Sequence, residues 1–365
     1  MKLISVDNLE PGLVASENIY TIDDRLVLPK GTVLDENDIQ RIKSHSLYNI
    51  FVEDEKQAVP VKSEDATQPL QQPDYSYAEK IKNSEAFIKF KQDIELNARQ
   101  LEESFKLIAS DKMALDIEKL TEPVYHLFVE AGGTAGVFDM LHNLRDNSDA
   151  VYMHSLNVSL ICNTIATWMK LPQEKIQLAT AGGLLHDIGK VLMPPDLLNK
   201  KDAYTEYEER FMKDHVVKGY ELVKDKDIDP RIKNCILMHH ECRDGSGYPF
   251  HLKGEQIDEI ASIVTVANLY EAMTAKKTYR APICPFTVIS RFEEEGINKF
   301  DPNVIMTFLS NIVNTFIANR VMLSTGQTGE IVFVNPDHLS RPVIKCGENF
   351  VDLASRREVS IVAVI

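Results

Sequence analysis

The sequence predicts a mainly α-helical fold, in which a large helical body is flanked by small β-rich segments at both ends. Three observations support this prediction. Apolar residues recur at helical spacings from about residue 78 to residue 318, short runs typical of strands occupy residues 1–55, and a second β-rich stretch covers residues 321–365. A chain of 365 residues is long enough for two or three domains.

Residues 1–55 are predicted to form a small β-rich domain. The turn signals Glu10-Pro11-Gly12 and Pro29-Lys30-Gly31 separate short runs, among them Leu26–Leu28 and Tyr48–Val52. Residues 35–45 are expected to form a short helix with Asp35 as its cap. No sensor or phosphorelay motif accompanies these elements, so the sequence leaves the role of this segment open.

Residues 56–85 are predicted to be a polar linker. From about Val59 to Tyr77 the chain is rich in proline and glutamine, with Pro60, Pro69 and Pro73 among them. A segment of this composition buries too little apolar surface to fold by itself.

Residues 86–320 are predicted to form the helical domain, and residues 321–365 a β-rich C-terminal segment. In the first long helix, Phe87, Phe90, Ile94 and Leu101 recur at spacings of three, four and seven residues. Such a stripe is more often a core face, and pairing with a second copy as a homodimer is the alternative. In the last segment, glycines and a proline separate the runs Ile331–Val334, Val343–Ile344 and Val359–Val364.

The charge balance limits the partners of this chain. Lys plus Arg number 40 and Asp plus Glu number 55, which gives a net charge of −15 at pH 7. This balance argues against DNA, RNA or an anionic membrane surface as a partner, because these require clustered basic side chains. A phosphate ester still fits an acidic protein if a metal cluster reverses the local field.

The expected location is the cytoplasm. No stretch approaches the roughly 18 consecutive apolar residues of a transmembrane helix. Asp7 and Glu10 stand where a signal peptide would need its apolar core. The five cysteines are odd in number and form no C-x-x-C pair, so we expect reduced thiols rather than a disulfide framework.

Five of the ten histidines lie between residues 154 and 240, in the company of acids. Adjacent residues on a helix point about 100° apart, so His186-Asp187 and His239-His240 are better placed to serve two neighbouring ions than to clamp one. Mixed imidazole and carboxylate ligands favour a first-row transition metal over Mg²⁺ or Ca²⁺. Two such ions are a common device for hydrolysing phosphoesters, because they activate water and neutralise charge on the phosphoryl oxygens.

Two strings carry a specific resemblance. The string His186-Asp187-Ile188-Gly189-Lys190, followed by residues 239–249 with the sequence HHECRDGSGYP, resembles the HD-GYP family. Members of this family are bacterial metal-dependent phosphodiesterases that act on cyclic di-GMP. The resemblance covers about residues 145–305 and implies a helical HD-type metal hydrolase domain.

The resemblance also implies roles for individual residues. Asp187 would bridge two metals and orient the attacking hydroxide, and Lys190 would approach the phosphate and protonate the leaving ribose oxygen. The loop with Asp244, Gly245, Gly247 and Tyr248 would form a lip beside the substrate and a surface for partner proteins, such as nucleotide cyclase domains of the GGDEF type. The implied metal ligands are His154, His186, Asp187, His215, His239, His240 and the residue at position 268.

Three departures from the family pattern affect the expected site. Asn268 stands where the family usually has an aspartate ligand, and Glu271, three residues on, is a candidate substitute. Ala150 stands where members with three metals carry a glutamate, so we expect two metals. The family's Arg-Pro-Tyr-Arg string, which meets the substrate phosphate, is here Lys277-Thr278-Tyr279-Arg280, and a lysine lacks the bidentate fork of arginine.

The sequence therefore leaves three functional hypotheses. The first is a two-metal phosphodiesterase that opens cyclic di-GMP to linear pGpG, with GMP as a further product. The second is a degenerate member that binds the nucleotide or a signalling partner without efficient turnover, which Asn268 and Lys277 favour. The third is hydrolysis of another cyclic dinucleotide or of a nucleotide monoester. Fe or Mn is the expected metal, with Zn and Ni as alternatives.

Overall fold

The structure is a computed structural model, and it describes residues 2–5, 9–16, 19–20, 26–35, 38–39, 42, 49–53, 77–144, 151–200, 204–275 and 282–365. The chain divides into two compact units, residues 1–74 and residues 75–365. The expected linker residues 56–76 lie outside the described part. Residues 77–82, which we had included in the linker, form helix α2 (Tyr77–Lys82).

The N-terminal unit is built from two small antiparallel pairs of strands. Strand β1 (Lys2–Ser5) pairs with β4 (Asn49–Val52), and β2 (Ile19–Tyr20) pairs with β3 (Leu26–Leu28). Of the helix expected over residues 35–45, residues 38, 39 and 42 are helical and the others, apart from Asp35, lie outside the described part. Oδ1 of Asp35 accepts the backbone N–H of Asp38 at 2.7 Å, as the expected cap should.

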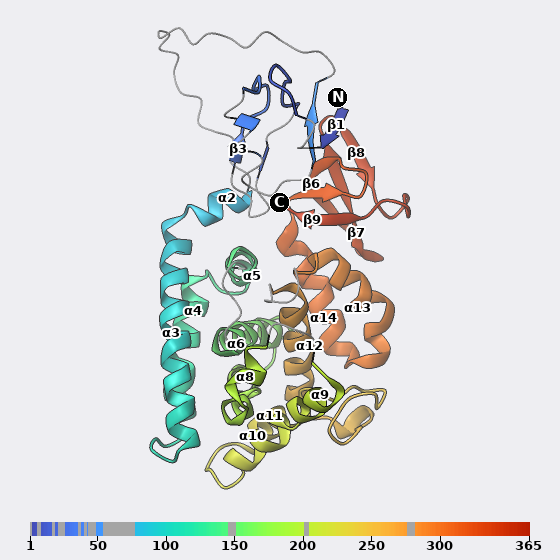
Figure 1. The fold of residues 1–365 in the computed structure, drawn as a ribbon. Helices are drawn as coiled ribbons and strands as arrows, with labels where there is room; N and C mark the ends of the chain where they lie inside the picture. Colours follow the sequence, from blue (N-terminus) through green and yellow to red (C-terminus); the bar gives the residue numbers. More distant parts are fainter. Residues whose placement is uncertain are drawn as a thin grey trace. The chain divides into compact units, whose positions relative to one another are not determined.

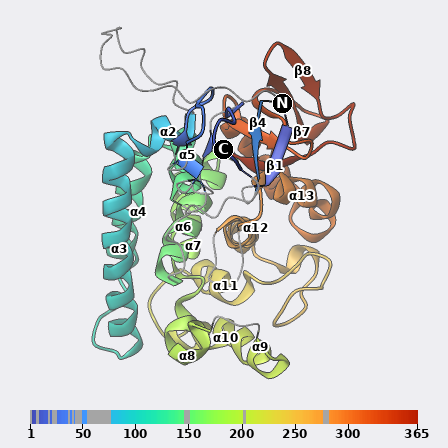
Figure 2. The same ribbon diagram turned by 45° about the horizontal axis from the view of Figure 1, so that its top comes forward.

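The second unit begins with a helical body, which Figure 1 and Figure 2 show from two directions. Its shorter elements are the 3₁₀ turns η2 (Ile188–Leu192), η3 (Gly254–Gln256) and η4 (Val313–Phe316). Its helices after α2 are α3 (Glu85–Ala109), α4 (Ile117–Glu130), α5 (Thr134–Asn143), α6 (Val151–Trp168), α7 (Gln173–Leu185), α8 (Pro195–Leu198), α9 (Glu206–Lys213), α10 (His215–Val223), α11 (Pro230–Met238), α12 (Glu259–Thr274), α13 (Pro285–Lys299) and α14 (Pro302–Ile312).

Helix α3 shows how the sequence specifies the outer helices. The Ser84 hydroxyl accepts the backbone N–H of Phe87 at 3.1 Å and fixes the first turn. The apolar stripe that begins at Phe87 is buried within the second unit, and its residues Phe90 and Ile94 have no exposed surface. The stripe is therefore a core face of the second unit and does not support pairing with a second copy.

Helices α6, α7 and α12 pack against one another at the centre of the body, and most of their residues are buried. In α6 every residue from Met153 to Ala166 is buried. Two glycines of α7 allow this close packing, since a Cβ on Gly182 would lie 2.6 Å from Sγ of Cys235 and one on Gly183 would lie 3.0 Å from Cα of Ser159. The centre therefore places the N-terminal end of α6 and the C-terminal end of α7 at fixed positions.

The C-terminal segment is an antiparallel sheet with strand order β8-β7-β6-β5-β9. It belongs to the same compact unit as the helices, and Glu293 on α13 accepts the backbone N–H groups of Leu339 and Ser340 at 2.6 and 3.0 Å. The strands are β5 (Arg320–Leu323), β6 (Thr328–Asn335), β7 (His338–Cys346), β8 (Asn349–Asp352) and β9 (Ile361–Val364).

Among the described helices, none combines the length and apolar character needed to cross a bilayer.

Candidate metal centre

Six residues that the sequence nominated as metal ligands come together in two groups. The first donor group is His154, His186 and Asp187, and the second donor group is His215, His239 and His240. Within each group the ligand atoms all lie within 4.8 Å of one another. Most of these residues stand at helix boundaries: His186 caps the C-terminus of α7, His215 begins α10, and His239 caps the C-terminus of α11.

Gly189 explains how the two donor groups come so close. A Cβ on this glycine would lie 1.9 Å from the carbonyl oxygen of His215 and 2.6 Å from the backbone nitrogen of Gly219. Only a residue without a side chain therefore lets the turn η2, which follows Asp187, pack against α10. The glycine of the His-Asp-Ile-Gly-Lys string is a structural requirement for joining the groups, which the sequence alone did not reveal.

Backbone carbonyls fix the orientation of three histidine rings. Nδ1 of His186 lies 2.7 Å from the Gly183 carbonyl oxygen, and Nδ1 of His215 lies 2.7 Å from that of Met212. Nδ1 of His239 lies 3.0 Å from the Ile236 carbonyl oxygen. Since a carbonyl only accepts, Nδ1 of each ring donates, and the neutral ring keeps its lone pair on Nε2, which is the form that binds a metal.

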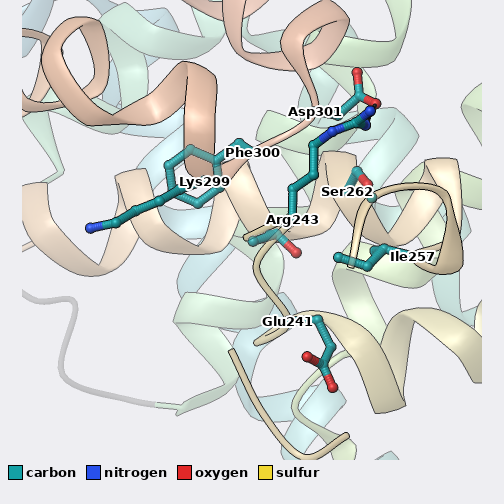
Figure 3. Close-up of a pocket in the computed structure, with 9 residues that line it drawn as sticks. Glu241, Arg243, Ile257, Ser262, Lys299, Phe300 and Asp301 are labelled. Carbon is teal, nitrogen blue, oxygen red and sulfur yellow. Dashed lines mark hydrogen bonds and ion pairs between the residues drawn. The ribbon is translucent and has the colours of Figure 1, made fainter. Parts of the chain in front are cut away.

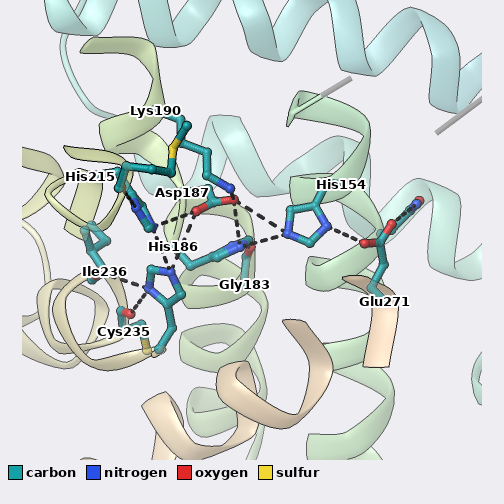
Figure 4. A network of polar contacts seen from close by, with 12 residues as sticks. His154, Gly183, His186, Asp187, Lys190, His215, Cys235, Ile236 and Glu271 are labelled. Atoms are coloured by element: carbon teal, nitrogen blue, oxygen red, sulfur yellow. Dashed lines mark hydrogen bonds and ion pairs between the residues drawn. The ribbon is translucent and has the colours of Figure 1, made fainter. Parts of the chain in front are cut away.

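The Nε2 atoms of the histidines point toward one another in pairs. Nε2 of His154 and Nε2 of His186 are 3.3 Å apart (Figure 4). The same distance separates Nε2 of His215 from Nε2 of His239. Lone pairs directed at each other at this distance would repel, so a cation between them is the chemistry that this arrangement fits.

Asp187 lies between the two donor groups and faces both. Its Oδ2 is 3.3 Å from Nε2 of His186 and 3.6 Å from Nε2 of His154, while its Oδ1 is 3.2 Å from Nε2 of His215. Although Asp187 is buried, its Oδ1 accepts no hydrogen bond from the residues that the structure describes. A buried carboxylate oxygen without a donor is costly, and a metal ion would satisfy it.

The electrostatics favour an ionised Asp187 and neutral rings at His239 and His240. Burial acts to raise the pKa of Asp187, but the Lys190 ammonium and His186 outweigh it and hold the pKa well below its usual range. Burial, together with the neighbouring rings, lowers the pKa values of His239 and His240 well below the ordinary value of a histidine. These are the protonation states that metal coordination requires.

Lys190 lies at the edge of this cluster. Its Nζ donates to Oδ2 of Asp187 at 2.5 Å, and its side chain keeps 23% of its surface exposed, whereas that of Asp187 keeps 1%. An ammonium that touches the shared carboxylate and also meets solvent is well placed to contact an anionic ligand entering the site.

The loop of residues 244–249 reaches the centre through Tyr248. The Tyr248 ring stacks on the ring of His240, with centroids 4.6 Å apart and planes 18° from parallel, and Nζ of Lys213 lies over the Tyr248 ring, 5.4 Å from its centroid. Burial raises the pKa of the Tyr248 hydroxyl, which keeps it neutral. The carboxylate of Asp244 instead accepts the N–H and hydroxyl of Ser246 within the loop, so in this structure it shapes the turn.

Glu241 is a functional candidate that sequence reasoning missed. It is 1% exposed, and its two carboxylate oxygens accept the backbone N–H groups of Phe250 at 2.6 Å and Leu252 at 3.0 Å. Glu241 directly follows His239 and His240, so these hydrogen bonds hold the segment after Tyr248 beside the two histidines. Its position, immediately after two adjacent histidines, was the available signal.

A shallow hollow lies behind the loop, and Glu241, Arg243 and Asp301 are among the residues that line it (Figure 3). Arg243 pairs with Asp301 at 3.3 Å, and its backbone N–H donates to the carbonyl oxygen of Lys299. These contacts fasten Arg243, directly before the loop, to the end of α13 and the start of α14.

Several expected residues are not tested by this geometry. Lys277, Thr278, Tyr279 and Arg280 lie outside the described residues, as does Ala150. Asn268 is on α12 and 8% exposed, and its role as a ligand stays a prediction.

Glu271 does not take the place of the missing aspartate ligand. Its Oε2 contacts Nδ1 of His154, which is the side of the ring turned away from His186 (Figure 4). The expectation that Glu271 substitutes as a ligand is therefore wrong in this structure, because its carboxylate supports a ligand ring from behind.

The fold and the site together define a class: a helical domain with two donor groups, fit for metal ions, around one shared carboxylate. Residues 140–304 match the sequence profile of the family described as HD domain. The matched region contains both strings with the ligand candidates, so the likeness to this family rests on this part of the chain.

Three curated relatives illustrate the likeness. A cyclic di-GMP phosphodiesterase of Pseudomonas aeruginosa is 34% identical over 141 residues, which are 38% of this chain and 34% of that protein. A 3′3′-cGAMP-specific phosphodiesterase of Vibrio cholerae is 29% identical over 148 residues, 40% of this chain and 28% of that protein. A cyclic di-GMP phosphodiesterase response regulator of Xanthomonas campestris is 33% identical over 138 residues, 37% of this chain and 36% of that protein. The chain thus spans about a third of the length of each.

Proposed function

We propose that this protein is a metal-dependent phosphodiesterase that hydrolyses cyclic di-GMP to linear pGpG, with GMP as a further product. The observation that carries the proposal is the Asp187 carboxylate, whose two oxygens face two separate donor groups. This is the arrangement that a bridging ligand between two metal ions requires. The names of the relatives support a cyclic dinucleotide as the substrate class.

Two divalent transition-metal ions, Fe or Mn with Zn and Ni as alternatives, would supply Lewis-acid activation of water and of the phosphoryl group when bound. We propose that the histidines hold them through Nε2 and that Asp187 holds both. Asn268 would add an uncharged amide oxygen to the ligand set.

The chain's own residues would perform the remaining chemistry. The Lys190 ammonium, anchored to Asp187 at 2.5 Å, would hold a phosphate oxygen and give its proton to the ribose oxygen as the P–O bond to that oxygen breaks. Water would provide the new P–O bond. Tyr248, held against His240, would bound one side of the substrate, with Gly245 and Gly247 allowing close backbone approach.

Lys277 and Arg280 are proposed to contact the other phosphate of the cyclic dinucleotide. The loop of residues 244–249 is the proposed contact surface for a partner such as a GGDEF-type cyclase domain. Reduced thiols are consistent with a cytoplasmic location, which is part of the proposal.

A second candidate function is binding without turnover. It is favoured by Asn268, since an uncharged ligand lowers metal affinity and could leave the nucleotide site without a full metal complement. If cyclic di-GMP binds at saturating metal but is not cleaved, that result would support this alternative.

The test is an assay of the full chain loaded with Mn²⁺ or Fe²⁺ under reducing conditions. Cyclic di-GMP and 3′3′-cGAMP are supplied separately, and the products are resolved by chromatography. We expect linear pGpG from cyclic di-GMP and loss of the activity after chelation. Binding without a linear product for any of the metals would overturn the proposed hydrolysis, and preferential cleavage of 3′3′-cGAMP would overturn the substrate assignment.

A further inference from the structure

The two donor groups differ in the partners of their histidine Nδ1 atoms, and the difference comes from Glu271. His154 is the one histidine of the first donor group whose Nδ1 meets a carboxylate instead of a backbone carbonyl. Glu271 is 4% exposed, so its charge is buried. Its other oxygen, Oε1, accepts Nδ2 of Asn157 at 3.0 Å, which fixes the carboxylate in place.

This carboxylate lies on the same helix as the position where a ligand charge is missing. Asn268 and Glu271 are three residues apart on α12, so their side chains project from neighbouring turns of one face. Asn268 can offer only a neutral oxygen to an ion, whereas Glu271 brings a full negative charge to the far side of a ligand ring. A carboxylate behind a ligating imidazole raises the basicity of that ring toward the metal.

We infer that Glu271 is a positioning residue that supplies, through His154, the negative charge that Asn268 does not supply directly. The inference rests on the proposed metal centre. It explains how the first donor group can retain an ion although one anionic ligand is replaced by an amide. It also distinguishes Glu271, which acts on the metal through His154, from Lys190 and the loop of residues 244–249, which face the substrate in the proposed function.

A purely structural role for Glu271 would require only a hydrogen-bond acceptor beside Nδ1 of His154. Glu271→Gln separates the two roles, because it keeps the shape and an acceptor oxygen but removes the charge. The substitution can be accommodated, since Oδ1 of Asn157 is buried and has no hydrogen-bond partner among the described residues. Rotation of the Asn157 amide would let that oxygen accept the new Gln NH₂ group.

The experiment measures Mn²⁺ binding to the full chain by calorimetry, with bound metal counted by elemental analysis. We expect Glu271→Gln to weaken one of the two binding events by about 10- to 100-fold and to leave the other within about threefold. In the double variant Asn268→Asp with Glu271→Gln, we expect most of the lost affinity to return, because a carboxylate then stands at the ligand position.

Glu293→Gln is the matched control. Glu293 is also a carboxylate held by two hydrogen bonds, but it accepts backbone N–H groups at the C-terminal sheet and touches none of the donor residues. This control should lower the melting temperature and leave Mn²⁺ affinity unchanged.

The inference is overturned if Glu271→Gln binds Mn²⁺ as the wild type does. It is also overturned if the loss occurs but Asn268→Asp does not restore affinity, since Glu271 would then act through geometry and not charge. A wild-type chain that binds no metal would instead overturn the metal centre itself, so the two failures are distinguishable.

Discussion

The two donor groups use similar side chains in different surroundings. The first donor group is wholly buried, contains the Asp187 carboxylate and has a second carboxylate, Glu271, behind His154. The second donor group consists of three imidazoles, and the rings of His215 and His239 are oriented by backbone carbonyls alone. Its outermost member, His240, is partly exposed and stacks on Tyr248.

This difference predicts that one donor group retains its metal ion and that the other exchanges its ion and meets the substrate. Negative charge and burial favour retention of an ion, so the first donor group should bind metal more tightly. Partial exposure beside an aromatic ring favours access, so the second donor group should exchange its ion more readily and meet the substrate first. Asp187 alone belongs to both environments, and changing it should have the largest effect.

Asp187→Asn should remove metal from both groups. The change keeps the side-chain shape but deletes the carboxylate charge that both groups face, at 3.3 Å from His186 and 3.2 Å from His215. We expect bound metal, measured by elemental analysis, to fall below one equivalent, and phosphodiesterase turnover to fall by about 10³-fold or more. Asp116→Asn, which alters a helix cap of α4, is the control. Two retained equivalents would refute the bridging role.

Single histidine variants should distinguish the groups. We expect a chelator titration of the metal-loaded chain to show two phases, and His240→Ala to remove the weaker phase. His154→Ala should remove the stronger phase, because it deletes the ring that Glu271 supports. Each variant should bind close to one equivalent. If both variants removed the same phase, the ions would not be divided between the groups as the geometry predicts.

Tyr248 gives a smaller and more specific effect. Tyr248→Ala removes the ring that stacks on His240, and an aromatic pair is worth about 0.5–1.5 kcal/mol, or roughly 2- to 10-fold. We expect a loss of this size in the affinity of the weaker metal phase. Tyr248→Phe retains the ring and should leave that affinity unchanged. A similar loss in both variants would assign the effect to the hydroxyl group and not to the stack.

Periodicity was sufficient to predict the fold class. The resemblance of two short strings to the HD-GYP family named His154, His186, Asp187, His215, His239 and His240, which the structure places in two groups, and their role as metal ligands stays a prediction. The sequence predicted the α3 stripe as core, and the structure confirms this. Adjacent histidines and acids also predicted two sites instead of one.

The supporting residues could not be found in this way, because their contacts join distant parts of the chain. Glu271 reaches a histidine 117 positions away. Helix spacing makes Glu271 a candidate substitute ligand, because spacing predicts a shared helix face but not which neighbour the side chain contacts. Gly189 looks like any turn glycine until the His215 backbone is placed 1.9 Å from its absent Cβ. Glu241 depends on a loop path that no periodicity encodes.

The smallest expected effect concerns α9, the helix directly before the second donor group. Hydrogen bonds from Lys200 and Thr205 lower the pKa of Glu208 to about 2, and Glu208 with Thr205 closes the N-terminal turn of α9. Because this pKa is lower in the folded than in the unfolded chain, the ionised Glu208 stabilises the fold above pH 4.5. That stabilisation is lost as the pH falls from 4.5 toward 2.

Glu208→Gln should therefore lower the melting temperature slightly at neutral pH, and the difference from the wild type should shrink as the pH falls through this window. Melting followed by circular dichroism at pH 7 and pH 3 measures both differences. Glu206→Gln changes the same turn, but the Glu206 side chain is 95% exposed and takes no part in the cap, so it should give no such pH-dependent difference. A difference for Glu208→Gln that stayed constant with pH would mean that its charge does not stabilise the turn leading to His215.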